Sequence, residues 1–226
     1  MSQDRNPQGS PHGRPYLSRR TLLAAGVGLA ATARAVPALA QVPAPAIAPR
    51  SSWGADLPPR GPLEAELPDD VRFLLVHHTA SGNNYGPGDA IGQLQSFYRF
   101  HTGPEKGWPD IAYNFLIDRF GVIYEGRQGS IDAPIKASAT GGSQGFAVLA
   151  CFIGDLEAEA PTDAAQESMV QLLTWLAARY AIDPMGQTTF ESRGSNLHPA
   201  GTVVTTGTIA GHRDMSQTTC PGQFCY

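Results

Sequence analysis

The chain has 226 residues, which is enough for one domain with a full hydrophobic core. Its 16 basic and 20 acidic residues give a net charge of −4. The first 40 residues contain five arginines and one aspartate, so the remainder has 11 basic and 19 acidic residues and a net charge of −8. Binding a phosphate backbone requires a positive surface, so this acidic chain excludes nucleic acid as a partner.

The first 40 residues have the three parts of a secretory signal. Arg19 and Arg20 precede an apolar stretch at 22–31, and a small-x-small cleavage site follows at 38–40. The arginine pair favours the twin-arginine export route. The apolar stretch is too short for a permanent transmembrane helix, so an uncleaved membrane anchor is the weaker alternative. We therefore expect a secreted protein, located in the periplasm or at the cell wall.

Residues 41–49 are rich in proline and alanine and are predicted to be a linker, so the folded domain should span residues 50–226. Residues 71–77 are mostly apolar and partly β-branched, without helical spacing, which predicts a buried strand. After a loop rich in glycine and asparagine, Asp89 can cap a helix that runs to about His101.

A β-hairpin is predicted next, with strands at 112–117 and 122–125 joined by a turn that ends in Gly121. Residues 126–145 are mostly glycine and small side chains, which have little to pack, so we predict a surface loop. Residues 146–153 form another apolar run and are predicted to be a buried strand.

Thr162 can cap a long amphipathic helix that ends near Tyr180. The polar stretch 183–208 is predicted to form an extended loop or a short hairpin. Strands that alternate with helices indicate one α/β domain with a mixed central sheet flanked by helices. We expect it to be a monomer.

The three cysteines are an odd number, so in an oxidising compartment at least one is unpaired or binds a metal. Cys151 lies in an apolar run and is predicted to be an inert core residue. A disulfide between Cys220 and Cys225 is the alternative to a metal role for Cys220, because that bond would consume the thiolate.

A turn-rich segment near the end of the chain places His212 eight residues before Cys220. Zinc takes nitrogen and sulfur ligands together, and a catalytic zinc keeps three protein ligands and one position for water. The third ligand could come from His77 or His78, at the end of the first predicted strand. Adjacent strand residues point to opposite faces, so only one of these two histidines should face the metal.

Three separated motifs resemble the zinc N-acetylmuramoyl-L-alanine amidases, the type-2 amidases that share a fold with peptidoglycan recognition proteins. The motifs are Val-His-His-Thr-Ala at 76–80, Gly-Trp-Pro-Asp-Ile-Ala-Tyr-Asn-Phe at 107–115, and Gly-His-Arg-Asp at 211–214 followed by Cys-Pro-Gly at 220–222. They occur in the family's order, and the resemblance extends from about Arg50 to Gly222.

The resemblance implies that His77, His212 and Cys220 are ligands of Zn²⁺, with His77 rather than His78 as the ligand from the strand. His78 is assigned to the substrate contacts, and the alternative is a packed or hydrogen-bonding group behind the ligands. Relatives that bind peptidoglycan without cutting it typically lack a zinc ligand, commonly the cysteine. All three ligand types are present here.

Tyr113 falls on the family's catalytic tyrosine, whose phenol can donate a hydrogen bond to the attacking water or to the developing oxyanion. A core aromatic on a strand is the alternative. Thr218 stands where phage-type members carry a lysine. It lacks that charge but can donate one hydrogen bond, so we group it with Tyr113 as a catalytic candidate.

Two further residues are candidates for binding substrate. Trp108 could stack on a sugar or fill the core. Arg127 could pair with a stem-peptide carboxylate, or be a solvated arginine. Many relatives carry a histidine and an asparagine in the loop before the third strand, whereas residues 137–143 contain neither. This departure affects substrate contacts more than zinc binding.

Zinc brings the pKa of bound water to near 7 and polarises a carbonyl, so it can hydrolyse an amide without a protein nucleophile. The resemblance implies cleavage between N-acetylmuramic acid and L-alanine in peptidoglycan or muropeptides, a substrate that an exported protein meets in the cell wall. Three alternatives remain: a binding module that recognises peptidoglycan without cutting it, a structural zinc domain, and a zinc amidase with another substrate. A structural site usually needs four protein ligands.

Overall fold

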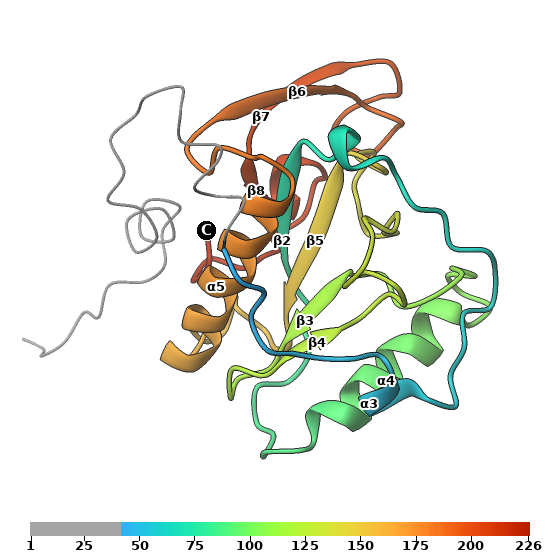
Figure 1. Ribbon diagram of the computed structural model, residues 1–226, viewed down its shortest axis with the longest axis vertical. Helices are drawn as coiled ribbons and strands as arrows, with labels where there is room; N and C mark the ends of the chain where they lie inside the picture. Colours follow the sequence, from blue (N-terminus) through green and yellow to red (C-terminus); the bar gives the residue numbers. More distant parts are fainter. Residues whose placement is uncertain (1–41) are drawn as a thin grey trace, which may run out of the picture.

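A six-stranded mixed sheet forms the centre of the domain (Figure 1). The computed structural model describes residues 42–226, and the predicted signal segment, residues 1–40, lies outside the described residues. In space the strands follow the order β1-β4-β3-β5-β2-β8. Their bounds are Ile47–Ala48 for β1, Phe73–His78 for β2, Phe115–Ile117 for β3, Ile123–Glu125 for β4, Ala147–Phe152 for β5 and Ile209–Gly211 for β8. In this sheet β3 and β4 pair antiparallel, and the other neighbouring strands run parallel.

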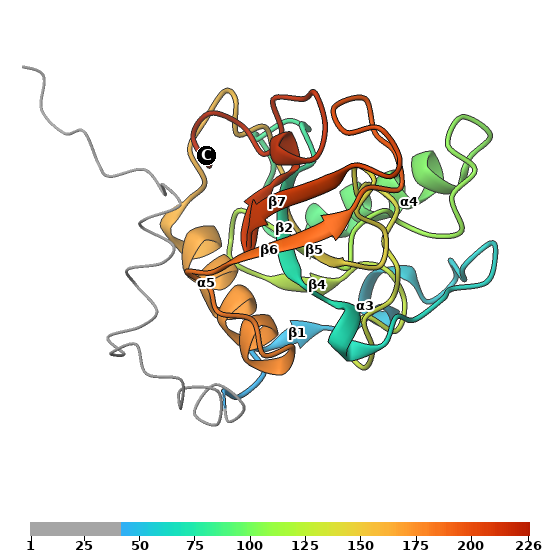
Figure 2. The ribbon, with the colours of Figure 1, turned by 90° about the horizontal axis from the view of Figure 1, so that it is seen from above.

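Helices lie on both faces of the sheet. Helix α5 (Asp163–Arg179) packs on one face, where its apolar side meets Leu74 and Val76 of β2. Helices α3 (Ser51–Gly54) and α4 (Ala90–Thr102) pack on the opposite face, against β3, β4 and β5. Figure 2 shows α5 and α4 on opposite sides of the strands. The predicted fold class, a single α/β domain with a mixed central sheet flanked by helices, is confirmed.

A second, two-stranded sheet covers the remaining part of the α4 face. Strands β6 (Gln187–Glu191) and β7 (Val203–Gly207) pair antiparallel, so the stretch predicted as a loop or a hairpin is a hairpin. Its inner residues pack against Phe73 and Leu75 of β2. Alternate residues of β2 therefore contact different layers, as the two-residue period of a strand requires.

The two long helices begin close to the predicted positions. The Oγ1 atom of Thr162 accepts a hydrogen bond from the Ala165 amide at 3.2 Å, which is the predicted cap of α5. Asp89 precedes α4 as predicted, but its carboxylate accepts from the Gly86 amide at 2.7 Å and makes no capping bond to the helix. The predicted capping role of Asp89 is therefore wrong.

Two predictions about loops differ from the structure. Ile47 and Ala48, inside the predicted linker, pair with β4 and form an edge strand. Residues 126–145, predicted as a surface loop, contain many buried side chains, including Arg127 and Ile135. The amide of Asn114 donates to the Ser130 hydroxyl and to the Ile135 carbonyl. This loop is thus anchored by polar contacts, which its small-residue composition does not indicate.

The remaining elements are two short 3-10 helices, η1 (Pro68–Asp70) and η2 (His212–Asp214). Helix η1 leads into β2, and η2 directly follows β8, so it starts at the same end of the sheet at which β2 finishes. Within residues 42–226, no helix has the length and apolar character needed to cross a membrane.

Candidate metal centre

His77 and His212 meet because their strands are parallel neighbours. Val76 of β2 pairs with Gly211 of β8, so the next residue along each chain, His77 in β2 and His212 just after β8, lies at the same end of the two strands. The two imidazole rings lie with their centroids 4.5 Å apart. His77 is buried, while His212 is partly exposed at the start of η2. The local turn is held by Asp214, whose carboxylate accepts a hydrogen bond from the Gly211 amide at 2.8 Å.

Cys220 is brought to the histidines by the loop after η2. Its Sγ atom lies 3.6 Å from Nδ1 of His77 and accepts a hydrogen bond from the His78 amide at 3.4 Å. The Arg213 amide donates to the Cys220 carbonyl at 2.9 Å, which joins the two ends of this loop. Gly222 ends the turn at φ 96°, and a Cβ there would meet the Leu156 backbone at 2.3 Å.

These contacts bring together the three residues predicted as metal ligands. One ligand atom from each of His77, His212 and Cys220 lies within 4.8 Å of the others, and no other such group occurs in residues 42–226. The Nε2 atom of His77 is buried and has no hydrogen-bond partner. Two nitrogens and one sulfur are a donor set that suits zinc, so the residues fit the predicted ion.

All three cysteines are free, so the alternative of a disulfide between Cys220 and Cys225 is not realised. Cys151 is fully buried in the core beside β2, as predicted for an inert thiol. Burial raises the pKa of Cys151 well above its ordinary value. Because Cys220 forms no disulfide, its sulfur remains available to a metal ion.

The charges of the site favour a bound cation. Burial, with repulsion from His212, holds the pKa of His77 well below its ordinary value, and burial lowers the pKa of His212 to about 4. Both rings are therefore neutral near pH 7, which is the form that binds a metal. Burial also raises the pKa of the Cys220 thiol to about 12, so a thiolate at this position needs a cation beside it.

Tyr113 lies beside the candidate ligands, just before β3. Its ring centroid is 5.1 Å from that of His77. Burial raises the pKa of the Tyr113 phenol well above its ordinary value. The phenol therefore keeps its proton near neutral pH and can donate a hydrogen bond to a developing negative charge.

Trp108 extends the aromatic contacts away from His77. It is partly exposed, and its ring lies 5.1 Å from the ring of His101, which in turn lies 5.8 Å from Tyr113. The Lys106 ammonium sits 5.7 Å from the Trp108 ring. Sequence reasoning did not single out His101, although its place on the buried side of α4 could have drawn attention to it.

His78 does not fit the predicted role as a substrate contact. It is buried, and its neighbour in the strand, His77, occupies the opposite face of the sheet. The Nδ1 atom of His78 accepts a hydrogen bond from the Leu156 amide at 3.0 Å. The alternative prediction, a hydrogen-bonding group behind the ligands, describes this residue.

Arg127 was predicted as a substrate contact or a solvated arginine, and the structure contradicts both. Only 2% of its surface is exposed, and its guanidinium donates to the protein on every side. The acceptors are the carbonyl groups of Ile111, Asp110 and Lys136 and the hydroxyl of Ser138. Arg127 therefore ties the segment before Tyr113 to the loop that follows β4.

Thr218 is exposed on the loop that carries Cys220. Its hydroxyl oxygen accepts a hydrogen bond from the Cys220 amide at 3.2 Å, which shapes the backbone at the ligand. The hydroxyl proton stays available to another acceptor. Its predicted catalytic role stays a prediction.

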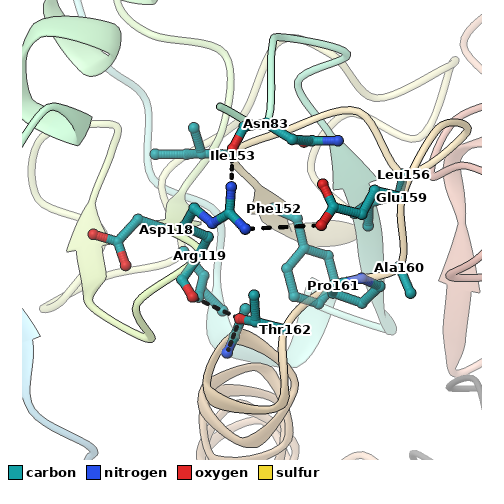
Figure 3. Close-up of a pocket in the computed structure, with 12 residues that line it drawn as sticks. Asn83, Asp118, Arg119, Phe152, Ile153, Leu156, Glu159, Ala160, Pro161 and Thr162 are labelled. Atoms are coloured by element: carbon teal, nitrogen blue, oxygen red, sulfur yellow. Dashed lines mark hydrogen bonds and ion pairs between the residues drawn. The ribbon is translucent and has the colours of Figure 1, made fainter. Parts of the chain in front are cut away.

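A small cavity of about 20 Å³ lies beyond the ends of β3 and β5, lined by Ile117 and Phe152 among others (Figure 3). Figure 3 shows the Arg119 guanidinium between Asn83 and Glu159 at this cavity. None of the three candidate ligands lines it. A space of this size has room for about one water molecule, so it is a small gap between packed loops and not the substrate site.

The fold and the converging side chains define a class: an α/β domain with a mixed sheet and a His-His-Cys group that could hold a metal ion. The family model described as N-acetylmuramoyl-L-alanine amidase matches residues 67–223. The chain belongs to this amidase family, which the sequence motifs predicted.

Individual relatives carry two kinds of name. The N-acetylmuramoyl-L-alanine amidase of Sus scrofa is 32% identical over 186 residues, which are 80% of this chain and 26% of that protein. Peptidoglycan recognition protein 1 of Bos indicus is 29% identical over 180 residues and is covered to 80%, as is this chain. This chain thus spans about a quarter of the first relative's length.

Solved structures agree with this fold. The crystal structure of Drosophila peptidoglycan recognition protein SD has a TM-score of 0.62 at 22% identity, over 81% of this chain and 92% of that one. Peptidoglycan recognition protein LE, solved in complex with tracheal cytotoxin, a monomeric diaminopimelic acid-type peptidoglycan, has a TM-score of 0.60 at 27% identity. That match covers 80% of this chain and 90% of the relative.

Proposed function

We propose that this protein is an exported zinc amidase that cleaves the bond between N-acetylmuramic acid and L-alanine in peptidoglycan. The observation that carries the proposal is the complete ligand group of His77, His212 and Cys220, with the cysteine free. The family to which the chain belongs, and the relatives named as amidases, support the reaction. The twin arginines Arg19 and Arg20 support export.

Zinc would be held by His77, His212 and Cys220, and when bound it activates water and polarises the scissile carbonyl. The protein's own part is to keep both imidazoles neutral and the Cys220 sulfur close to His77. Tyr113, protonated at neutral pH, donates a hydrogen bond to the negative charge that develops on the carbonyl oxygen.

The neighbouring groups suggest how substrate is held. The partly exposed ring of Trp108 offers a flat apolar surface to a sugar or to the stem peptide. Thr218, exposed beside Cys220, can donate its hydroxyl proton to the same substrate. Arg127 contributes indirectly, because its internal hydrogen bonds hold the segment that leads to Tyr113.

Purified residues 41–226, loaded with zinc, should release stem peptides that begin with a free L-alanine amine from insoluble peptidoglycan, as resolved by mass spectrometry. Chelation should stop release, and added zinc should restore it. Release of sugars without stem peptides would contradict the proposal.

The competing function is peptidoglycan recognition without cleavage. The relatives and solved structures named as peptidoglycan recognition proteins favour it. Tight binding of muropeptides by the zinc-loaded protein, with no product released, would select this second function.

A further inference from the structure

His101 is a buried histidine next to the candidate metal centre that does not belong to the ligand group. It lies in the last turn of α4, on the same buried side as Leu94 and Tyr98, and is 7% exposed. Leu94 and Tyr98 pack into the apolar cluster between α4 and the sheet. His101 lies beyond this cluster, and its ring packs against Trp108 and Tyr113 beside the candidate metal centre.

Two hydrogen bonds, one to the carbonyl and one to the ring of His101, connect this residue to the segment that carries Trp108 and leads to Tyr113. Its carbonyl oxygen accepts from the Trp108 amide at 2.9 Å. The Nδ1 atom of its ring accepts from the Ala112 amide at 3.2 Å, one residue before Tyr113. One residue of a regular helix thus holds both functional parts of an otherwise irregular segment.

The His101 ring also packs directly against the two side chains in question. Its centroid lies 5.1 Å from Trp108 at an interplanar angle of 36°, and 5.8 Å from Tyr113 at 77°. Tyr113 in turn lies 5.1 Å from His77. A displacement of the His101 ring would therefore reach Tyr113 directly, and would reach the candidate ligand His77 through Tyr113 alone.

We propose that His101 is a positioning residue, which fixes the Tyr113 phenol and the Trp108 indole relative to the metal centre. The proposal rests on the proposed function, because it assigns those two side chains to the reaction and to substrate binding. A histidine suits the task because it combines a flat ring with an acceptor at Nδ1, while its proton stays on Nε2.

Two substitutions separate these properties. His101→Asn keeps an acceptor near the position of Nδ1 and removes the ring, whereas His101→Phe keeps a ring and removes the acceptor. A third variant, Leu94→Ala, serves as a matched control. It removes a buried side chain from the same helix that makes none of the hydrogen bonds or ring contacts by which His101 holds Trp108, Ala112 and Tyr113. It should cost stability without changing turnover.

The test is steady-state cleavage of a soluble muropeptide by zinc-loaded wild type and the three variants, with bound zinc measured in parallel. For His101→Phe we expect kcat to fall by about 100-fold, which is typical when a reacting group is displaced by about 1 Å. For His101→Asn we expect kcat within about tenfold of wild type and a higher KM, because Trp108 loses the ring it packs against. Zinc content should not change.

The proposal is overturned if His101→Phe retains the wild-type kcat and KM, or if its loss of kcat is matched by Leu94→Ala. It is also overturned if His101→Phe loses zinc, since the residue would then support the ligands instead of Tyr113.

Should the wild type bind muropeptide without cleaving it, the proposed function fails and binding decides the role of His101. Both His101 variants should then weaken muropeptide affinity by about tenfold while Leu94→Ala does not, and equal affinities would overturn the positioning role as well.

Discussion

The rings of His77 and His212 face one another with centroids 4.5 Å apart and an interplanar angle of 41°. Two protonated imidazoles at this separation would repel each other, and burial already disfavours their charge. Burial raises the pKa of the Cys220 thiol beside them to about 12, so the thiol also stays uncharged near neutral pH. A metal ion suits all three side chains, because it binds neutral imidazoles and stabilises a thiolate.

Replacing Cys220 with alanine should therefore remove the metal. An outer-shell partner typically contributes about 10- to 100-fold to metal affinity, and a direct ligand should contribute more. We expect zinc to stabilise the wild type by about 4 kcal/mol at a thousandfold excess over its Kd, and to leave Cys220→Ala unchanged. Thermal unfolding with zinc and with chelator, together with metal analysis, measures both effects.

Cys225→Ala is the matched control for this experiment. Cys225 is also a buried thiol whose pKa burial raises to about 12, but it belongs to the apolar cluster under α5. This variant should bind zinc like the wild type. Loss of zinc in Cys225→Ala, with retention in Cys220→Ala, would show that the ligand assignment is wrong.

Removing the hydroxyl of Tyr113 should slow catalysis without affecting the metal. In Tyr113→Phe we expect kcat to fall by about 100- to 1,000-fold, the usual effect of removing one donor to a developing oxyanion. The ring remains, so its packing against His77 and the zinc content should persist. Equal turnover of wild type and variant would leave Tyr113 with a packing role only.

Acid should destabilise the protein through His101. Burial, with repulsion from Arg127 and Lys106, lowers the pKa of His101 from 6.5 to about 4. Below pH 6.5 the His101 imidazole is protonated in the unfolded chain, whereas in the folded state it stays neutral until about pH 4. The free energy of unfolding therefore decreases as the pH falls from 6.5 to about 4. At about 1.4 kcal/mol per pKa unit, this loss amounts to about 3 kcal/mol.

Urea unfolding of the wild type and His101→Asn, at about pH 7.5 and about pH 4, isolates this contribution from other titrating groups. The stability advantage of the wild type over the variant should shrink by about 3 kcal/mol at the lower pH. A difference that does not depend on pH would contradict the assignment of this loss to His101.

Arg127→Ala should destabilise the fold. The substitution leaves buried acceptors without a donor, among them the carbonyl oxygens of Ile111 and Asp110. Each unsatisfied buried group costs about 1–3 kcal/mol, so we expect a total of about 3–5 kcal/mol. Arg60→Ala, at an exposed arginine in the neighbouring segment, should change stability by less than about 0.5 kcal/mol. Urea unfolding of both variants makes the comparison.

Regular elements could be predicted from the sequence because their signals are local. Helix α5 has an apolar period and a capping threonine, and its buried residues follow that period. The central strands are apolar runs that are buried on both faces of the sheet. The edge strand β1 was missed because Ile47 and Ala48 lie in a stretch rich in proline, and only pairing with β4 makes them a strand.

The metal ligands could be predicted because their residue types and spacing are visible in the sequence. Residues whose role depends on contacts with segments far away in the chain were missed. The spacing of His212 and Cys220 indicated two ligands, and the family resemblance selected His77. The roles of Arg127 and His101 depend on acceptors and donors in other segments, such as Ile111 and Ala112. No residue pattern near Arg127 distinguishes an internal brace from an exposed cation.

The burial of Arg127 also bears on how related sequences are compared. An arginine retained at this position during evolution would record the need to keep two chain segments joined, not a common ligand. Specificity should instead diverge at partly exposed neighbours such as Trp108, where substitution leaves the scaffold intact. Homologues should therefore be grouped by the residue at the position of Trp108, and not by the buried guanidinium of Arg127.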